Sequence, residues 1–137
     1  MEKLEKEVSP EIELLFLKRN ALFGCVVGVV ALSSQVIYGV ALLTLLVLLS
    51  LSFFRLIVAL PNWKYLFWTG NCKDEYFNYL NNRAYRYATI TSLFTCGFLY
   101  GLDMESVSGK SVTIIIGATT SFAYSLPLLY WLRGNDE

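Results

Sequence analysis

The sequence predicts an all-α polytopic membrane protein, a bundle of four transmembrane helices forming one domain over residues 1–137. Hydrophobic residues occupy 55% of the positions and charged residues only 16%, against about 25% charged residues in an ordinary soluble domain. Four apolar stretches are long enough to cross a bilayer core of about 30 Å, which takes about 20 helical residues. The Lys and Arg residues are concentrated on one side of these stretches, which orients the bundle.

The first two spans come from one long uncharged run that begins at Ala21. As a single helix continued through Leu60, this run would be about 60 Å long, roughly twice the thickness of the membrane core. The chain must therefore fold back. We place the turn near Tyr38, which predicts spans at about 20–38 and 40–60.

The other two spans are predicted at about 86–104 and 111–132. The third is the more polar, because several hydroxyl side chains interrupt its charge-free part, and such a helix prefers protein neighbours to lipid. The fourth contains Pro127, whose missing N–H should kink the helix.

Two helices are predicted to begin outside the membrane. Ser9, followed by Pro10, is a suitable N-cap for a helix that runs into the first span. From Lys73 onward apolar residues recur with a helical period, so a second helix, with Asn71 as its N-cap, should continue into the third span.

The basic residues give the orientation. Ten of the eleven Lys and Arg residues lie on one side of the spans, and only Lys110 lies on the other. We therefore expect a multi-pass protein of the cell inner membrane, with both termini, the tail 1–19 and the segment 61–86 in the cytoplasm. Arg55, five residues before Leu60, is interpreted as snorkelling to the cytoplasmic surface rather than as part of a pore or voltage sensor.

The cytoplasmic segment has two features. Residues 61–68 hold four aromatic side chains and one Lys, which suits a segment at the headgroup level better than a ligand-binding aromatic box. The helix that follows has a polar face, our candidate partner surface, although a plain solvated face is the simpler interpretation. The residues of this face are Tyr76, Asn78, Asn82, Arg83 and Arg86.

Small residues spaced four apart predict close helix packing, because helices in a bilayer associate through backbone approach and polar contacts. The predicted packing or partner positions are Gly24, Gly28, Gly97, Gly101, Gly117 and Ser121. They place the tight contacts among the first, third and fourth spans, and leave the second span facing lipid or another subunit. We favour packing within the chain over a dedicated dimer seam, since this spacing is common in apolar helices.

Hydroxyl side chains on the third and fourth spans are candidates for a polar path through an oligomer. They are Ser92, Thr95, Thr113 and Thr120. Interhelical hydrogen bonding also explains them, and we favour it.

Several kinds of chemistry are disfavoured. The chain has no histidine, which is the usual general base and the commonest metal ligand, and its confident spans contain no Asp or Glu. The net charge is zero and no run of one sign occurs, so nothing indicates nucleic-acid binding. We therefore expect no catalytic residue, metal or cofactor, and we expect membrane lipids and another membrane protein or a second copy of the chain as partners.

Two classes of function remain. The first is a non-enzymatic membrane protein that acts through protein–protein interaction. In size and hydropathy the chain is similar to the immunity proteins that protect bacteria against pore-forming toxins and to small membrane components of bacterial defence systems. That similarity implies docking against a toxin's helical hairpin. The alternative is an oligomeric channel or small transporter subunit, with the hydroxyl faces around its axis.

Overall fold

The computed structural model describes residues 9–36, 40–69, 72–102 and 108–134. All regular structure in these ranges is helical, and no strand occurs in them. The helices are α2 (Pro10–Val36), α3 (Val40–Val58), α4 (Trp63–Thr69), α5 (Glu75–Gly101) and α6 (Gly109–Arg133). The predicted all-α class is confirmed.

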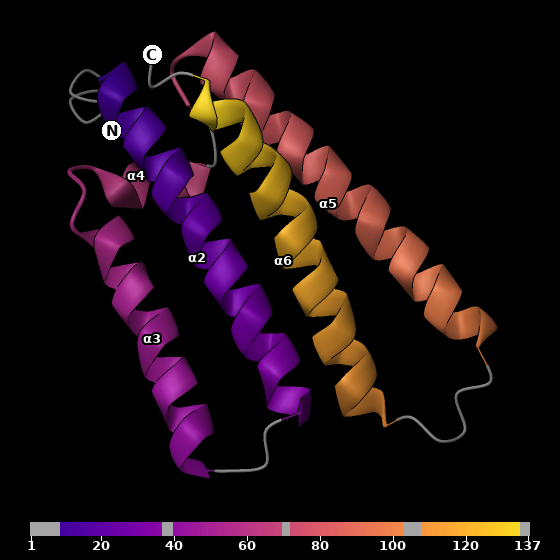
Figure 1. Ribbon diagram of the computed structural model, residues 1–137. Helices are drawn as coiled ribbons and strands as arrows, with labels where there is room; N and C mark the ends of the chain where they lie inside the picture. The colour runs from indigo at the N-terminus through magenta and orange to yellow at the C-terminus, as the bar shows by residue number, and fades with distance from the viewer. Residues whose placement is uncertain (1–8, 37–39, 70–71, 103–107, 135–137) are drawn as a thin grey trace.

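The four long helices lie side by side in the order α3, α2, α6, α5 (Figure 1). α2 packs on α3 and α6, and α6 packs on α5, whereas α5 barely touches α2. Successive long helices run in opposite directions, so α2 begins and α6 ends at the same end of the molecule, beside α4 (Figure 1). We call this the termini end. The opposite end, where α5 diverges from α6, is called the far end.

The two helix starts outside the predicted spans lie close to their expected positions. The Ser9 side chain accepts a hydrogen bond from the Ile12 N–H at 3.4 Å, and Pro10 fills the first helical position of α2, as predicted. The N-cap of α5 is Asp74, which accepts from the N–H of Tyr76 and Phe77 at 2.9 and 3.3 Å. The predicted cap at Asn71 lies outside the described residues.

Each long helix is continuous. α2 ends at Val36 and α3 begins at Val40, so the predicted turn at Tyr38 lies outside the described residues. α5 joins the predicted cytoplasmic helix to the third span without a break, and α6 continues through Pro127.

Among the described residues two helices, not the predicted four, are long and apolar enough to cross a membrane: Pro10–Gln35 and Gly109–Arg133. α3 contributes only a shorter apolar stretch, Thr44–Val58. α5 does not qualify because its first half carries Asn and Arg side chains and only about fifteen residues after Arg86 are free of charge. Length and composition alone therefore suggest a membrane association only weakly.

α4 folds back against the first hairpin. Asn62, with φ of 57°, lies in the left-handed region that Asn tolerates and allows the tight turn after α3. The Phe54 ring then lies 6.2 Å from Trp63, 6.5 Å from Phe67 and 5.5 Å from Phe23. Part of the aromatic stretch therefore packs against the hairpin of α2 and α3.

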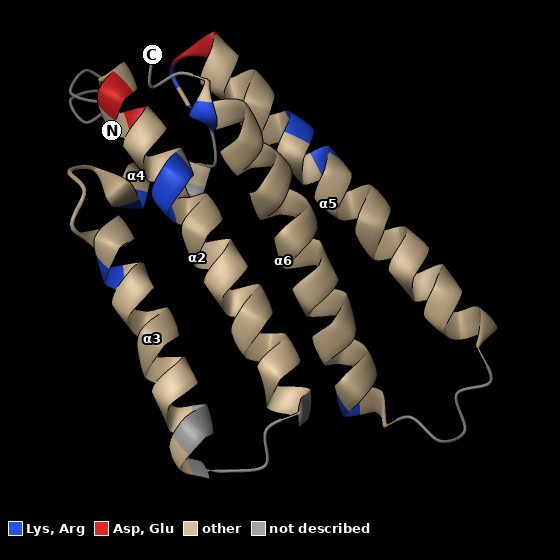
Figure 2. Ribbon diagram, in the orientation of Figure 1, with Lys and Arg blue, Asp and Glu red and all other residues tan. Residues whose placement is uncertain are grey.

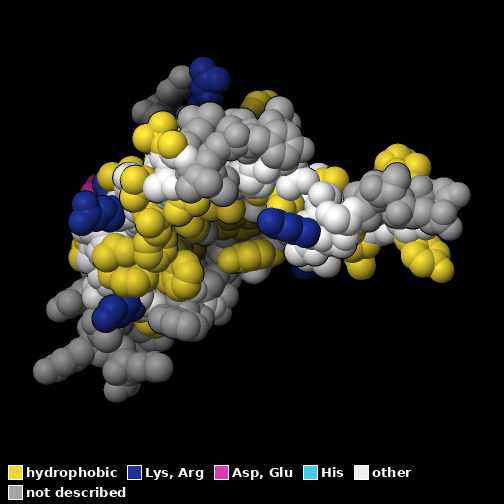
Figure 3. Space-filling view, turned by 90° about the horizontal axis from the view of Figure 1, so that it is seen from below, with side chains coloured by type: hydrophobic (Ala, Val, Ile, Leu, Met, Phe, Trp, Pro, Cys, Tyr) yellow, Lys and Arg dark blue, Asp and Glu magenta, His cyan; other side chains and the backbone are white. Residues whose placement is uncertain are grey.

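The buried core lies at the termini end, where all five helices meet. Its residues are Phe16, Leu17, Ala21, Ile57, Leu60, Leu66, Cys72, Phe77, Leu80, Ala84, Leu128 and Leu132. The far-end half of α5 contrasts with it, because Leu93, Phe94, Phe98 and Tyr100 are 68, 76, 69 and 93% exposed. Seen from the far end, hydrophobic side chains cover much of the described surface (Figure 3).

Candidate functional site

Charged side chains are concentrated toward the termini end. Among the described residues, the acidic groups lie there, and Lys110 is the only Lys or Arg at the far end (Figure 2). The sorting of charge along the sequence is therefore also a sorting in space.

Glu13 links the start of α2 to the start of α5. Its side chain is 1% exposed, and its carboxylate accepts hydrogen bonds from the backbone N–H of Lys73 and of Asp74, the latter at 2.9 Å. These N–H groups directly precede α5, where the helix dipole favours negative charge. Glu13 lies in the first turn of α2, so its carboxylate connects the start of one helix to the start of another.

Arg19 binds the C-terminal end of α3, as Glu13 binds the N-terminal end of α5. Its guanidinium donates to the carbonyl oxygen of Leu56. That carbonyl is available because the Leu60 N–H bonds to the Ile57 carbonyl at 3.1 Å instead. A cation at the C-terminal end of a helix is favourable for the same dipole, with the sign reversed.

A chain of polar side chains joins α2, α6 and α5. The Asn20 amide donates to the Tyr124 hydroxyl at 3.1 Å, and that hydroxyl donates to Oδ1 of Asn81 at 2.8 Å. Asn81 is buried, and the Tyr85 ring lies 4.9 Å from the Tyr124 ring. Asn20 and Asn81 were not predicted as site residues, because the Tyr124 hydroxyl that links them lies far from both in the sequence.

The structure divides the predicted small-residue positions into two groups. A Cβ on Gly24 would clash with Oγ of Ser125 and lie 3.7 Å from the Ser121 carbonyl oxygen, and one on Gly28 would lie 2.9 Å from the Phe122 ring. These positions therefore allow the close contact between α2 and α6.

The other three glycines behave differently. A Cβ added at Gly97, Gly101 or Gly117 would meet nothing within 4 Å. α5 does pack on α6, but the buried residues of α5 include Leu80 and Ala84 and neither Gly97 nor Gly101. These three positions take no part in packing between the described helices. Of the two predicted roles, packing within the chain is therefore wrong for them, and contact with a partner stays a prediction.

Three of the four hydroxyl groups of the predicted polar path donate hydrogen bonds within their own helices. Thr95 donates to the Thr91 carbonyl at 2.8 Å, and Thr120 donates to the Ile116 carbonyl at 2.7 Å. Thr113 donates to Gly109 at 3.0 Å, while Ser92 is half-buried. The favoured prediction of interhelical hydrogen bonds is therefore wrong for these threonines, because the carbonyl four residues earlier is always within reach.

The predicted polar face of α5 also divides. The Arg83 guanidinium lies 4.5 Å from the centre of the Trp131 ring on α6, in cation–π contact. Asn78 is half-buried, whereas Tyr76, Asn82 and Arg86 are exposed. Arg83 thus helps to hold α5 on α6, while Asn82 and Arg86 face outward.

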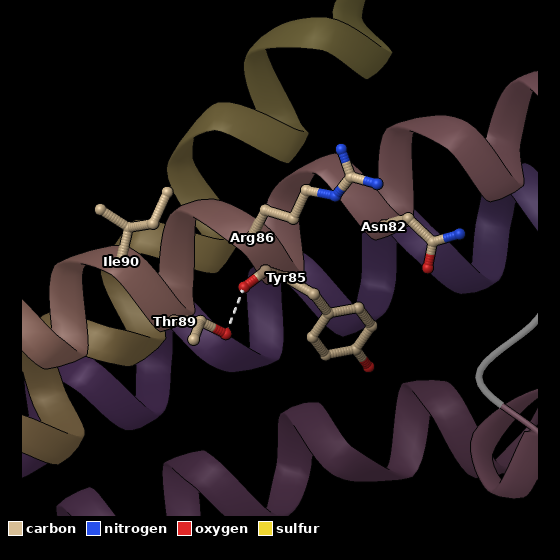
Figure 4. A pocket seen from close by; sticks show the side chains of 5 residues that line it. All are labelled: Asn82, Tyr85, Arg86, Thr89 and Ile90. Carbon is tan, nitrogen blue, oxygen red and sulfur yellow. Dashed lines mark hydrogen bonds between the residues drawn. The ribbon is translucent and has the colours of Figure 1, made fainter.

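Asn82 and Arg86 line a shallow hollow of about 410 Å³ on α5, together with Tyr85, Thr89 and Ile90 (Figure 4). The Thr89 hydroxyl donates to the Tyr85 carbonyl at 2.9 Å. Arg86 forms no ion pair or hydrogen bond with a described residue. Within the described ranges no group of three His, Cys, Asp or Glu side chains could hold a metal ion.

Cys72 is a poor nucleophile. Burial raises the pKa of its thiol from the ordinary 9.0 to about 12, with a further contribution from the negative charges of Glu13 and Asp74. The thiol therefore stays protonated at neutral pH and packs in the core as a small hydrophobic group.

Comparison with known proteins assigns no family to the chain. No protein-family model matches the chain, and neither a curated protein nor a solved structure shows significant similarity to it.

Proposed function

We propose that the chain is a multi-pass protein of the cell inner membrane with both termini in the cytoplasm. Two observations support insertion beyond the two long apolar helices. Large hydrophobic side chains are exposed along α3 and along the far-end half of α5, where water would make the exposure costly. Basic residues are concentrated at the termini end, which the positive-inside rule assigns to the cytoplasm.

In this proposal all four long helices cross the bilayer, and α5 projects its first turns into the cytoplasm. The charge-free part of α5 is short for a full span, but Arg83 and Arg86 lie just before it, where long basic side chains reach the headgroups. α3 is also short, and Arg55 in its last turn can extend to the surface in the same way.

We further propose that the protein is not an enzyme and acts by binding another membrane protein inside the bilayer. One observation carries this proposal: the outer face of α5 at the far end contacts no other described helix and combines small with large residues. Gly97 and Gly101 leave open backbone four residues apart, and Phe94 and Phe98 stand beside them. A partner helix can approach closely over such glycines, since packing rather than hydrophobicity drives association in lipid.

An immunity-type or defence-system component is the form of this function that the size of the chain suggests. In that form α5 would dock against a helical hairpin of a pore-forming toxin. Cells that express the protein should then survive the toxin, and Gly97→Leu or Gly101→Leu should remove protection while the protein still folds. Full protection by both variants would contradict this mechanism.

A crosslinking experiment tests the general proposal without knowledge of the partner. A photo-crosslinking amino acid replaces Phe98 on α5 or, as a matched control, the similarly apolar and exposed Leu48 on α3. We expect a discrete protein adduct from position 98, lost when Gly97→Leu is added, and none from position 48. No adduct at position 98, or equal yields at both positions, would refute docking on α5.

The channel alternative gains no support from the described residues. A polar path needs side chains that are free to hydrate an ion or solute, and Thr95, Thr113 and Thr120 donate to their own helices. The space between α5 and α6 at the far end is instead lined largely by apolar side chains, including Leu99, Val112 and Ile116.

A further inference from the structure

We propose that the hollow formed by Asn82, Tyr85, Arg86, Thr89 and Ile90 binds the phosphate headgroup of an anionic phospholipid. This inference rests on the membrane insertion proposed above, but not on the docking of a protein partner. It assigns a ligand class to the part of the polar face of α5 that does not contact α6.

The chemistry of the hollow fits a phosphate. Arg86 presents a planar guanidinium with five N–H donors, which matches phosphate oxygens in a bidentate geometry, and the Asn82 amide adds donors one helical turn away. No acidic residue lines the hollow. Glu13, the buried carboxylate among the described residues, is already bonded to backbone N–H groups, so the charge of Arg86 is left for an external anion.

The two arginines of α5 differ in a way that singles out Arg86. Arg83 lies over the Trp131 ring of α6 and is held there. Arg86 is exposed on the side of α5 away from α6, and it is the last charged residue of the helix. One positive charge therefore stands at the boundary between the charged and the apolar parts of α5, where lipid headgroups meet the hydrocarbon core.

The surface below the hollow fits an acyl chain. Ile90 closes the hollow on the far-end side, and Leu93 follows on the same helical face; both are more than half exposed. Asn82, Arg86, Thr89 and Leu93 recur at spacings of four, three and four residues, which places them on one face. From Asn82 to Leu93 this face extends about 16 Å along the axis and changes from polar to apolar, as a phospholipid does.

Native mass spectrometry of the detergent-solubilised full chain tests the proposal. The probes are dioleoylphosphatidylglycerol, the zwitterionic dioleoylphosphatidylcholine and inorganic phosphate, titrated separately. We expect preferential retention of one phosphatidylglycerol and an apparent affinity about tenfold lower in Arg86→Gln. Arg133→Gln is the matched control, because it removes the same charge from an exposed position at the termini end, and it should leave the affinity unchanged.

Three outcomes would overturn the site. Equal retention of the two lipids would remove the preference for an anionic headgroup, and equal losses in Arg86→Gln and Arg133→Gln would indicate diffuse attraction to the basic end. Phosphate binding as tight as lipid binding would make this a site for the free anion. Arg86→Lys keeps the charge without the bidentate geometry and should bind with intermediate affinity. This second variant keeps the site testable if Arg86→Gln does not fold.

The lipid-binding experiment and the crosslinking experiment can fail independently of each other. Loss of the lipid site in Arg86→Gln should leave the Phe98 adduct intact, because position 98 lies three helical turns further along α5. Conversely, absence of a protein partner would leave the lipid preference in place.

Discussion

The two ends of the molecule differ in how their helices are held together. At the termini end, helices α2 to α6 share a buried core, and charged or amide side chains bridge between helices. At the far end α5 leaves α6 and exposes a row of large hydrophobic side chains. One end therefore stabilises the fold, whereas the other leaves large hydrophobic side chains of α5 exposed.

α2 is responsible for most of this asymmetry. Within eight residues it carries Glu13, Arg19 and Asn20, which reach the start of α5, the end of α3 and the Tyr124 hydroxyl of α6. Further along α2, Gly24 and Gly28 continue only the contact with α6. Glu13, Arg19 and Asn20 all lie in the first half of α2, so these polar links between helices are concentrated toward the termini end.

The sharpest test compares two leucines. Leu17 is fully buried at the termini end, so Leu17→Ala should lower the free energy of unfolding by about 2–5 kcal/mol. Leu93 is largely exposed at the far end, so Leu93→Ala should change it by less than about 0.5 kcal/mol. Equilibrium unfolding in mixed micelles measures both, and similar losses would show that the far end is packed as tightly as the termini end.

A smaller effect is expected from the carboxylate that caps α5. Glu13→Gln removes the charge that accepts two backbone N–H groups and should cost about 1.5–3 kcal/mol, the usual contribution of a hydrogen bond to a charged group. The exposed Glu11, in the same first turn of α2, provides the control as Glu11→Gln. Hydrogen exchange should also accelerate at residues 75–78 in the Glu13 variant alone; unchanged protection there would show that Glu13 does not hold the start of α5.

The smallest effect concerns the pH dependence of the termini end. Because the pKa of Cys72 is raised to about 12 in the folded chain, the folded state favours the protonated thiol, and this contribution is complete below pH 9.0. It should be lost progressively as the pH rises from 9.0 towards 12, which lowers the free energy of unfolding. Cys72→Ala should show a shallower decline over the same range. Identical slopes for the two proteins would indicate that the thiol is not buried as described.

Local pattern in the sequence was enough to predict the all-α class, the start of α2 at Ser9 and Pro10, and the continuity of α5 into its apolar half. It also identified Gly24 and Gly28 as packing positions. Each of these depends on period, capping or spacing within a single helix. The charge order along the chain likewise becomes a charged end in space, because successive long helices run in opposite directions.

The tertiary structure alone decided which side chains join the helices. Glu13 meets the N–H of Asp74 across 61 residues, and Asn20 meets Tyr124 across 104, so no local pattern marks these pairs. The placement of Gly97 and Gly101 on an open face, and of Arg83 against Trp131, depends on how α5 is rotated and tilted on α6. Periodicity specifies that a helix has faces. Which neighbour each face meets is set by packing among all the helices, and that is why the two ends differ.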